Sequence, residues 1–358
     1  MSAPTETRLA AELWPDDVRL VTLPGMSLRV HRRVALLTGV LALGCLVASV
    51  WSMTIGDTDL SASQIVAALF GQGDASSQTV VVQWRMPRTL MALFGGAALG
   101  VSGAIFQSIT RNPLGSPDVI GFSTGAYTGA LIAMLLVGST NSTSAASVGA
   151  LIGGLTTALA VYLLAMKRGV NGMRLIVVGI AVAAFLNAVN SYLMIRASRE
   201  AAVSAAAWGA GTLNNSTWNG VWILVASLVL LLPFTIVMAR QLQMLELGDD
   251  AARALGIDAE RARRLLLVLG VGYVTVITAL AGPISFVALA APQVARRFTG
   301  AAGVAMVPAA LMGALLLLVA DALARIVIAP GQLPVGVVTS CIGGGYLLWL
   351  LIHQARAR

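Results

Sequence analysis

The chain has 358 residues, of which 58% are hydrophobic and only 11% are charged, and its formal net charge is +8. A soluble domain carries roughly 25% charged residues, so too few polar side chains are present here to cover a water-facing surface. The basic balance is almost entirely arginine, with Lys167 as the only lysine, and no basic helix face interleaved with aromatic residues indicates a nucleic-acid partner. The composition therefore excludes an ordinary soluble protein and predicts a chain largely covered by lipid.

Apolar segments of about 20 residues predict membrane-spanning helices, because a helix rises about 1.5 Å per residue and must cross roughly 30 Å of hydrocarbon. About ten such segments follow one another: 34–53, 89–108, 121–137, 145–166, 175–195, 220–239, 265–281, 283–295, 303–320 and 334–352. The expected fold class is an all-α polytopic membrane protein. Residues 1–33 are expected to form a cytoplasmic N-terminal tail, residues 34–358 a single transmembrane domain, and Ser61–Phe70 a short surface helix outside.

The basic residues predict the topology. In the ten-span arrangement with the N-terminus inside, 18 of the 23 arginine and lysine residues fall in inner segments and five in outer segments. This positive-inside bias predicts a multi-pass protein of the plasma (cell inner) membrane with both termini in the cytoplasm. The five outer residues are Arg85, Arg88, Arg196, Arg199 and Arg325.

The sequence argues against an energy source within the chain. A phosphate-binding P-loop needs a lysine after glycine, and Lys167 does not follow a glycine-rich loop. Ion-coupled carriers usually place carboxylates at mid-membrane depth, but the first seven spans contain no Asp or Glu, and Asp118 and Asp321 lie near span ends. Cys45 and Cys341 lack C-x-x-C spacing and the two histidines have no companion ligands. We therefore expect no catalytic residues, no metal site and no cofactor in this chain, and energy from a partner.

Three segments carry a more specific signal. The first combines Arg85-Met86-Pro87-Arg88 with a glycine-rich span, in which Gly96, Gly100 and Gly103 would let helices approach closely. The second is the longest inner loop, 240–264. It contains a predicted helix over Asp249–Leu255, with carboxylates at its N-terminus and Gly256 at its end. The third comprises Gly282–Arg296 and Gln332–Thr339.

At these segments the sequence resembles the FecCD family of permeases, which import iron-siderophores, haem and vitamin B12 by ATP hydrolysis. The resemblance covers nearly the whole chain beyond the tail. It implies a BtuC-like permease domain of about ten helices in two inverted-repeat halves, about 34–200 and 219–358. It also implies a non-catalytic transport subunit, with the substrate passing by alternating access at the interface with a second FecCD-type permease subunit, in a heterodimer.

The same resemblance implies further partners. Two ATPase subunits would hold ATP and Mg, and a siderophore-binding protein, periplasmic or a lipoprotein, would deliver the ferric chelate. The stretch Leu247-Gly248-Asp249-Asp250 and the run Gln332–Gly336 favour the ferric-enterobactin branch, so a catecholate siderophore is the expected substrate. Gln293 stands where many family members have a histidine, which leaves the role of that histidine unassigned here.

Site residues carried over from the family fall into three groups. Coupling to the ATPase is expected at Leu247, Gly248, Asp249, Asp250, Ala251, Ala254, Leu255 and Gly256. Docking of the binding protein is expected at Arg85, Arg88 and Arg325, for which interfacial anchoring is the alternative. Arg196 is a candidate for the substrate mouth, because an arginine there would attract an anionic ferric tris-catecholate, although topology alone explains it equally well.

Other functions stay open at this point. They are a FecCD-type importer of another iron chelate, haem or cobalamin, an ion-coupled secondary carrier, and a membrane-embedded structural or signalling subunit. A carrier predicts intramembrane carboxylates, and a structural subunit predicts no docking helix on the cytoplasmic face. The sequence does not identify the siderophore, nor whether the second permease is identical.

Overall fold

The computed structural model describes residues 18–23, 26–56, 58–137, 143–165, 172–300, 303, 305–328 and 331–356. Lys167 and the first 17 residues of the predicted tail lie outside the described residues. The described part of the tail contains an antiparallel hairpin of β1 (Val18–Leu23) and β2 (Met26–His31), paired from Val18↔His31 to Leu23↔Met26. The sequence analysis did not predict these strands.

The rest of the described chain is helical. The helices are α2 (Arg32–Thr54), α3 (Ala62–Leu69), α4 (Ala75–Gln78), the π-helix η1 (Thr79–Arg85), α5 (Met86–Thr110), α6 (Phe122–Val137), α7 (Thr143–Ala165), α8 (Gly172–Arg196), α9 (Arg199–Gly209), α10 (Trp218–Glu246), α11 (Asp249–Ala254), α12 (Ala259–Ala281), α13 (Val287–Thr299), α14 (Met306–Ile326) and α15 (Val335–Arg356). Each of the ten predicted spans overlaps one of these helices, and the predicted surface helix is α3.

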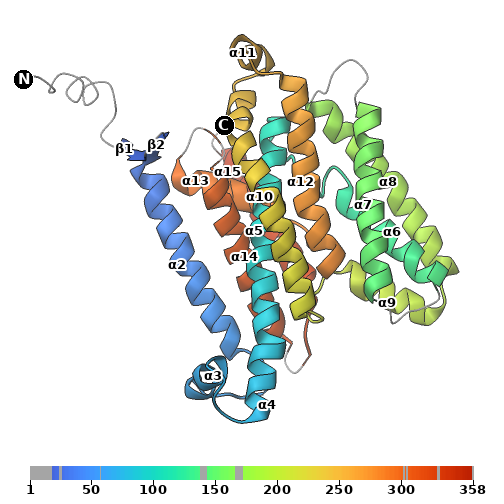
Figure 1. The fold of residues 1–358 in the computed structure, drawn as a ribbon. Coiled ribbons are helices and arrows are strands. Elements are labelled where there is room, and N and C mark those ends of the chain that lie inside the picture. The colour runs from blue at the N-terminus through green and yellow to red at the C-terminus, as the bar shows by residue number, and fades with distance from the viewer. Residues whose placement is uncertain are drawn as a thin grey trace, which may run out of the picture.

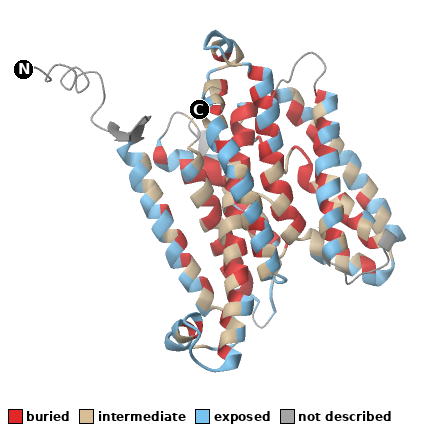
Figure 2. Cartoon of the chain, viewed as in Figure 1, coloured by how far each residue is buried: buried red, intermediate tan, exposed pale blue. Residues whose placement is uncertain are grey.

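Seven helices within the described residues are long and apolar enough to cross a membrane: α2, the continuous Ala75–Thr110 unit, α7, α8, α10, α12 and α14. Large apolar side chains on their outer faces are exposed, among them Val47, Leu159 and Val229 (Figure 2). Contiguous exposed apolar surface of this extent is unsuited to water. The chain is therefore a multi-pass membrane protein, whereas the count of ten spans stays a prediction.

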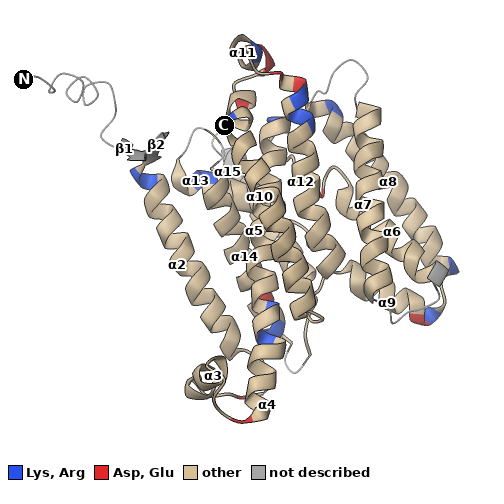
Figure 3. Cartoon of the chain, in the orientation of Figure 1, with Lys and Arg blue, Asp and Glu red and all other residues tan. Residues whose placement is uncertain are grey.

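The long helices form one bundle whose two ends differ (Figure 1). The start of α2, the end of α15 and the short helix α11 lie at one end, which we call the α11 end. Helices α3 and α4 lie at the opposite end, which we call the α3 end. Charged side chains gather at these two ends, and the middle of the bundle is almost free of them among the described residues (Figure 3).

Helix α5 runs through the centre of the bundle and packs along α14. A methyl group on Gly96 or Gly100 would overlap the backbone of α14, and one on Gly103 would overlap the backbone of Ala288 in α13. The predicted close approach of helices at these glycines is confirmed. Two hydrogen bonds also hold α5 to its neighbours: Ser102 Oγ donates to Gly270 O of α12 at 2.7 Å, and Gln107 Nε2 donates to Leu289 O of α13 at 2.9 Å.

The helix after α12 begins later than predicted, at Val287 rather than Pro283. Gly282 ends α12 in a positive-φ conformation (φ 74°), and Pro283 has no N–H with which to continue a helix. Neighbouring backbone bonds close off this break: the Thr212 N–H donates to Ala281 O at 2.7 Å, and the Gly336 N–H donates to Gly211 O at 3.1 Å. Within the irregular segment Gly282 and Ile284 are buried by the surrounding protein.

Candidate docking and coupling sites

Asp321 organises the charged residues at the α3 end. Its carboxylate is fully buried on α14 and receives Arg88 of α5, with Nε to Oδ1 at 2.9 Å, Nε to Oδ2 at 3.1 Å and Nη2 to Oδ1 at 2.9 Å. Arg325, one helical turn along α14, contacts Oδ2 through Nη2 at 3.0 Å. Charge-assisted bonds of this kind are the strong ones in a buried setting. The carboxylate therefore joins α5 to α14.

Arg325 and a third arginine, Arg85, also donate hydrogen bonds to the end of α2 and to the loop that follows it. Arg325 Nη1 donates to Ser52 O and to Ile55 O, both at 3.0 Å, and its Nη2 donates to Ser52 Oγ. Arg85 Nη1 donates to Met53 O at 2.7 Å, and its Nη2 donates to Thr58 O. We call Arg85, Arg88, Asp321 and Arg325 the Asp321 cluster.

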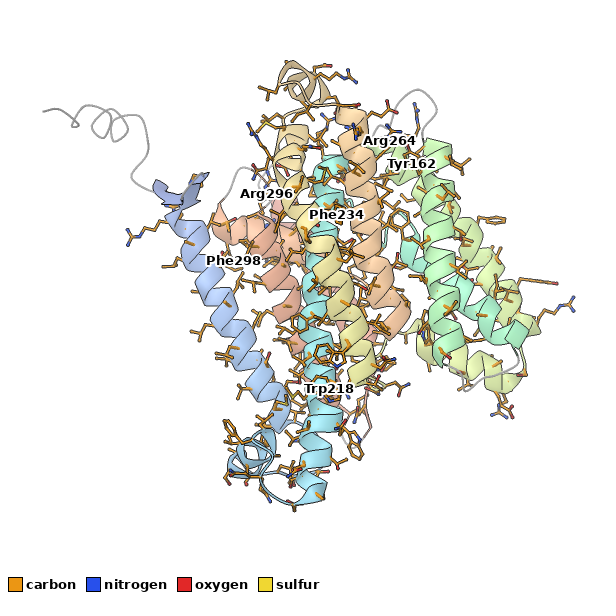
Figure 4. All side chains as sticks on the ribbon, viewed as in Figure 1. Tyr162, Trp218, Phe234, Arg264, Arg296 and Phe298 are labelled. Atoms are coloured by element: carbon orange, nitrogen blue, oxygen red, sulfur yellow. The ribbon has the colours of Figure 1, made fainter. Side chains whose placement is uncertain are left out.

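A cavity of about 560 Å³ borders this cluster. It is lined by Ile55, Gly56, Thr58, Val80, Trp84, Arg85, Arg88, Asn214, Ser216, Arg325 and Gln332. Arg88 Nη1 donates to Gln332 Oε1 at 2.7 Å. Close by, Trp218 at the start of α10 (Figure 4) donates from Nε1 to Val82 O of η1 at 2.9 Å. The lining holds three arginines and, among the described residues, no carboxylate, so the cavity is suited to an anionic group.

The structure brings the three predicted docking arginines together but does not expose them. Sequence analysis expected outward-facing side chains, whereas all three are less than 9% exposed and have hydrogen-bond partners within the chain. Their access to a partner is through the cavity rather than across an open surface. Asp321 and Gln332 were not assigned to this site from the sequence. The i, i+4 spacing of Asp321 and Arg325 could have revealed the first of them.

The predicted short helix of the longest loop is present as α11 (Asp249–Ala254). It follows Gly248, and Gly256 after it has φ 80°, a left-handed conformation that favours glycine. Leu247 and Leu255 at its two ends are 67% and 61% exposed, while Ala252 on its other side is buried. Exposed apolar side chains thus flank the helix on both sides along the chain.

Asp249 holds α11 to the bundle. Its Oδ1 accepts from Arg263 Nη2 of α12 at 2.6 Å and from Arg111 Nη2, at the end of α5, at 3.1 Å. We call these three residues the Asp249 junction. Asp250 is fully exposed, and its Oδ1 pairs with Arg253 Nη1 of the same helix at 3.4 Å. Arg111 and Arg263 were not assigned to this site from the sequence.

A second cavity, of about 230 Å³, lies beside the Asp249 junction. Its lining is polar: Gln107, Ser108, Arg111, Asn112, Pro113, Glu246 and Arg296. Ser108 Oγ donates to Glu246 Oε1, and Arg296, at the end of α13, is seen in Figure 4. Gln293 of α13 donates from Nε2 to Pro113 O at 2.6 Å. These contacts join the ends of α5, α10 and α13 near α11.

Comparison with known proteins decides the family. Residues 44–353 match the FecCD transport family. The chain belongs to the FecCD transport family. One relative is the ferric enterobactin transport system permease protein FepG of Escherichia coli, 48% identical over 92% of this chain and 99% of that protein. Another is the iron(3+)-hydroxamate import system permease protein FhuG of Bacillus subtilis, 37% identical over 84% of this chain and 92% of that protein.

The fold agrees with that of a solved transporter structure. A structure described as an inward-facing conformation of a metal-chelate type ABC transporter superposes with a TM-score of 0.78 at 28% identity. It covers 89% of this chain and 99% of that one. The resemblance inferred from the sequence is therefore confirmed at the level of family and fold.

Two further predictions for this FecCD-family chain concern Arg196 at a substrate mouth and the absence of a metal or cofactor. Arg196 ends α8, is exposed, and lies over the Tyr192 ring with its Cζ 5.6 Å from the centroid. It does not line the large cavity, so its role at a substrate mouth stays a prediction. Within the described residues no three His, Cys, Asp or Glu side chains form a group suited to a metal ion. The expectation that the chain holds no metal or cofactor likewise stays a prediction.

Proposed function

We propose that this chain is a transmembrane subunit of an ABC importer for ferric siderophores, with ferric-enterobactin-like catecholates as the preferred substrate. The observation that carries the proposal is its near full-length similarity to a ferric enterobactin permease. Similarity to permeases for hydroxamate and citrate chelates supports the broader class of iron chelates. Haem and cobalamin are the alternatives within the family, and an ion-coupled carrier is disfavoured by the match to ABC transporter subunits.

The proposed architecture is ten spans in two inverted-repeat halves, in the cell inner membrane, with both termini in the cytoplasm. The start of α2, the end of α15 and α11 share one end of the bundle, which suits this orientation (Figure 1). The predicted excess of arginine in the inner segments assigns the same end to the cytoplasm. The substrate would pass at the interface with a second FecCD-type permease subunit, because a ferric chelate is bulky for a pathway within one bundle.

The Asp321 cluster is proposed to receive the siderophore-binding protein at the outer end. Three arginines in the lining make the cavity cationic, and an acidic side chain of the binding protein would find guanidinium groups already oriented by Asp321, Gln332 and the end of α2. Groups held in place before binding lose little freedom on association. Complementary charge of this kind raises specificity and the association rate more than the affinity.

Helix α11 is proposed to dock on a partner ATPase at the cytoplasmic end. Its exposed Leu247 and Leu255 suit an apolar groove, and the Asp249 junction connects the helix to α5 and α12. ATP and Mg would be bound by the two ATPase subunits, so this chain would be a non-catalytic transport subunit. The driving force would enter the membrane part through α11.

A growth experiment tests the substrate class. The chain is expressed with its second permease, ATPases and binding protein in a host that lacks its own siderophore permeases, under iron limitation. Ferric enterobactin or another ferric catecholate should restore growth, and omission of this chain should abolish the rescue. Rescue by haem or cobalamin in place of every ferric siderophore would contradict the proposal.

A further inference from the structure

Both ends of α5 carry an arginine bound to an aspartate of another element. At the α3 end Arg88 contacts Asp321 of α14, and just beyond its other end Arg111 contacts Asp249 of α11. The helix between them has 25 residues, and it is held to α14 through glycines that bring the two backbones into contact. A helix packed this closely cannot bend freely, because dense packing resists small displacements.

The position of Arg111 is set by the backbone as well as by its charge. It is the C-cap residue of α5, with φ 50° and ψ 35°, a left-handed conformation that is uncommon for a residue other than glycine or asparagine. Its N–H donates to Gln107 O and Ser108 O, which closes the last turn of α5. Arg111 therefore lies where α5 ends, and its side chain reaches Asp249 of α11.

The two aspartates at the start of α11 differ in what they contact. Asp249 is bound to the bundle through Arg111 and Arg263, whereas Asp250 is bound to Arg253 within α11. The Asp249 side chain is 29% exposed and the Asp250 side chain is fully exposed. Of these two aspartates, Asp249 is therefore the one whose side chain joins the start of α11 to other helices.

We propose that Arg111 is a positioning residue that transmits displacement of α11 to α5, and through α5 to the Asp321 cluster at the other end. The proposal rests on the function proposed above, in which an ATPase moves α11. It assigns Arg111 to coupling rather than to ATPase binding, because Leu247 and Leu255, the exposed apolar residues that flank α11, take no part in the Asp249 junction.

The test uses the whole complex, of both permease subunits and two ATPases, in proteoliposomes. The variants are Arg111→Asn, Arg111→Lys, Asp249→Asn and the double variant Arg111→Asn with Asp249→Asn. Asparagine accepts the left-handed backbone at position 111 and removes the charge, whereas lysine keeps the charge. Glu260→Gln is the control, because Glu260 is an exposed carboxylate in the same loop. The readout is stimulation of ATP hydrolysis by binding protein loaded with ferric enterobactin, alongside the rate without binding protein.

Arg111→Asn should lower the stimulation by about fivefold or more, within the usual range of coupling between sites, while the ATPase subunits still co-purify. Arg111→Lys should retain most of the stimulation, and the double variant should be no worse than Asp249→Asn alone, since the two side chains act through one contact. Wild-type stimulation in Arg111→Asn would overturn the inference, as would additive losses in the double variant. Absence of ATP-dependent uptake in the wild-type complex would instead refute the proposed function.

Discussion

The two ends of this chain use the same three-residue arrangement at different depths. In the Asp321 cluster one aspartate lies between Arg88 and Arg325, and in the Asp249 junction one aspartate lies between Arg111 and Arg263. Asp321 is fully buried, whereas the Asp249 side chain is 29% exposed and the Arg111 side chain 44% exposed. The two Arg–Asp–Arg arrangements are alike, but the side chains of the Asp249 junction are more exposed to solvent.

Because their exposure differs, the two groups of charges are expected to contribute differently to stability. Removing one member of a buried group leaves another charge without compensation and costs about 3–5 kcal/mol, whereas exposed ion pairs contribute about 0.2–1 kcal/mol. The Asp321 cluster is therefore a fixed part of the fold that orients arginines at the cavity. In the Asp249 junction the pair with Arg111 is partly exposed and is expected to be the weaker one, whereas the Arg263 side chain is only 4% exposed.

Loss of Asp321 is expected to have the largest effect. Asp321→Asn would leave Arg88 and Arg325 facing a neutral amide in a buried site and should lower the free energy of unfolding by about 3 kcal/mol or more. Thermal unfolding of the purified complex in detergent measures it, with Asp250→Asn as the exposed control. An equal melting temperature for the Asp321→Asn and wild-type complexes would show that the buried cluster is not structural.

Separation of α5 from α14 should have the next largest effect. Gly100→Val would force its side chain into the backbone at Ala309, and overpacking of this kind costs about 1–3 kcal/mol. Gly39→Val in α2 is the matched control, since an added methyl there meets no atom within 4 Å. Siderophore uptake and thermal stability should fall for Gly100→Val and stay near wild type for the control. Equal behaviour of the two variants would argue against close packing as the link between the two ends.

Gly256 tests the α11 end by backbone strain alone. Its φ is 80°, and no atom lies within 4 Å of an added methyl group, so Gly256→Val should act only through a conformation that costs other residues about 1 kcal/mol or more. We expect transport to be uncoupled from ATP hydrolysis in proteoliposomes. Gly256→Asn, which tolerates a left-handed backbone, should recover much of the loss. Unaltered uptake and ATPase stimulation in Gly256→Val would remove this residue from the coupling site.

The smallest effect is expected at Asp250. Its pair with Arg253 is exposed and local to α11, so Asp250→Asn should leave the melting temperature of the complex near that of the wild type. Stimulation of the ATPase should also fall less than in Asp249→Asn. Both variants should be measured at low and at high salt. Because salt screens exposed charges most, the effect of Asp250→Asn should depend more on salt than that of Asp249→Asn. A larger loss in Asp250→Asn than in Asp249→Asn would reverse the roles assigned to the two aspartates.

Much of the fold follows from hydropathy, and the exceptions have physical reasons. Helices α10 and α12 extend beyond their apolar segments, because the amphipathic turns at their ends carry charge. Helix α12, for example, begins at Ala259 with Asp258 accepting hydrogen bonds from the Glu260 and Arg261 N–H groups. Helix α9 and the β1–β2 hairpin were not predicted, since neither is a long apolar segment. The break at Gly282 was marked by Gly-Pro, but its length depends on contacts from distant backbone.

The sites were predictable only in part for a similar reason. Residue types and family resemblance picked out Arg85, Arg88 and Arg325 as a group, but burial and the central place of Asp321 depend on how α5, α14 and α2 pack. The helix α11 followed from its turn residues and charges. The contact between Arg111 and Asp249 joins residues 138 positions apart, so no local sequence pattern predicts it.

This chain is expected to carry no transport cycle alone and to work as the permease of an ATP-driven importer. The most direct measurement is uptake of ferric enterobactin into proteoliposomes, made with this chain alone and with the complete complex. Ferric enterobactin should accumulate only with the complete complex and with ATP on the side of the membrane where the ATPases lie. Accumulation should stop when any component is omitted. Concentrative uptake by the chain alone under a proton or sodium gradient, without ATP, would contradict the account.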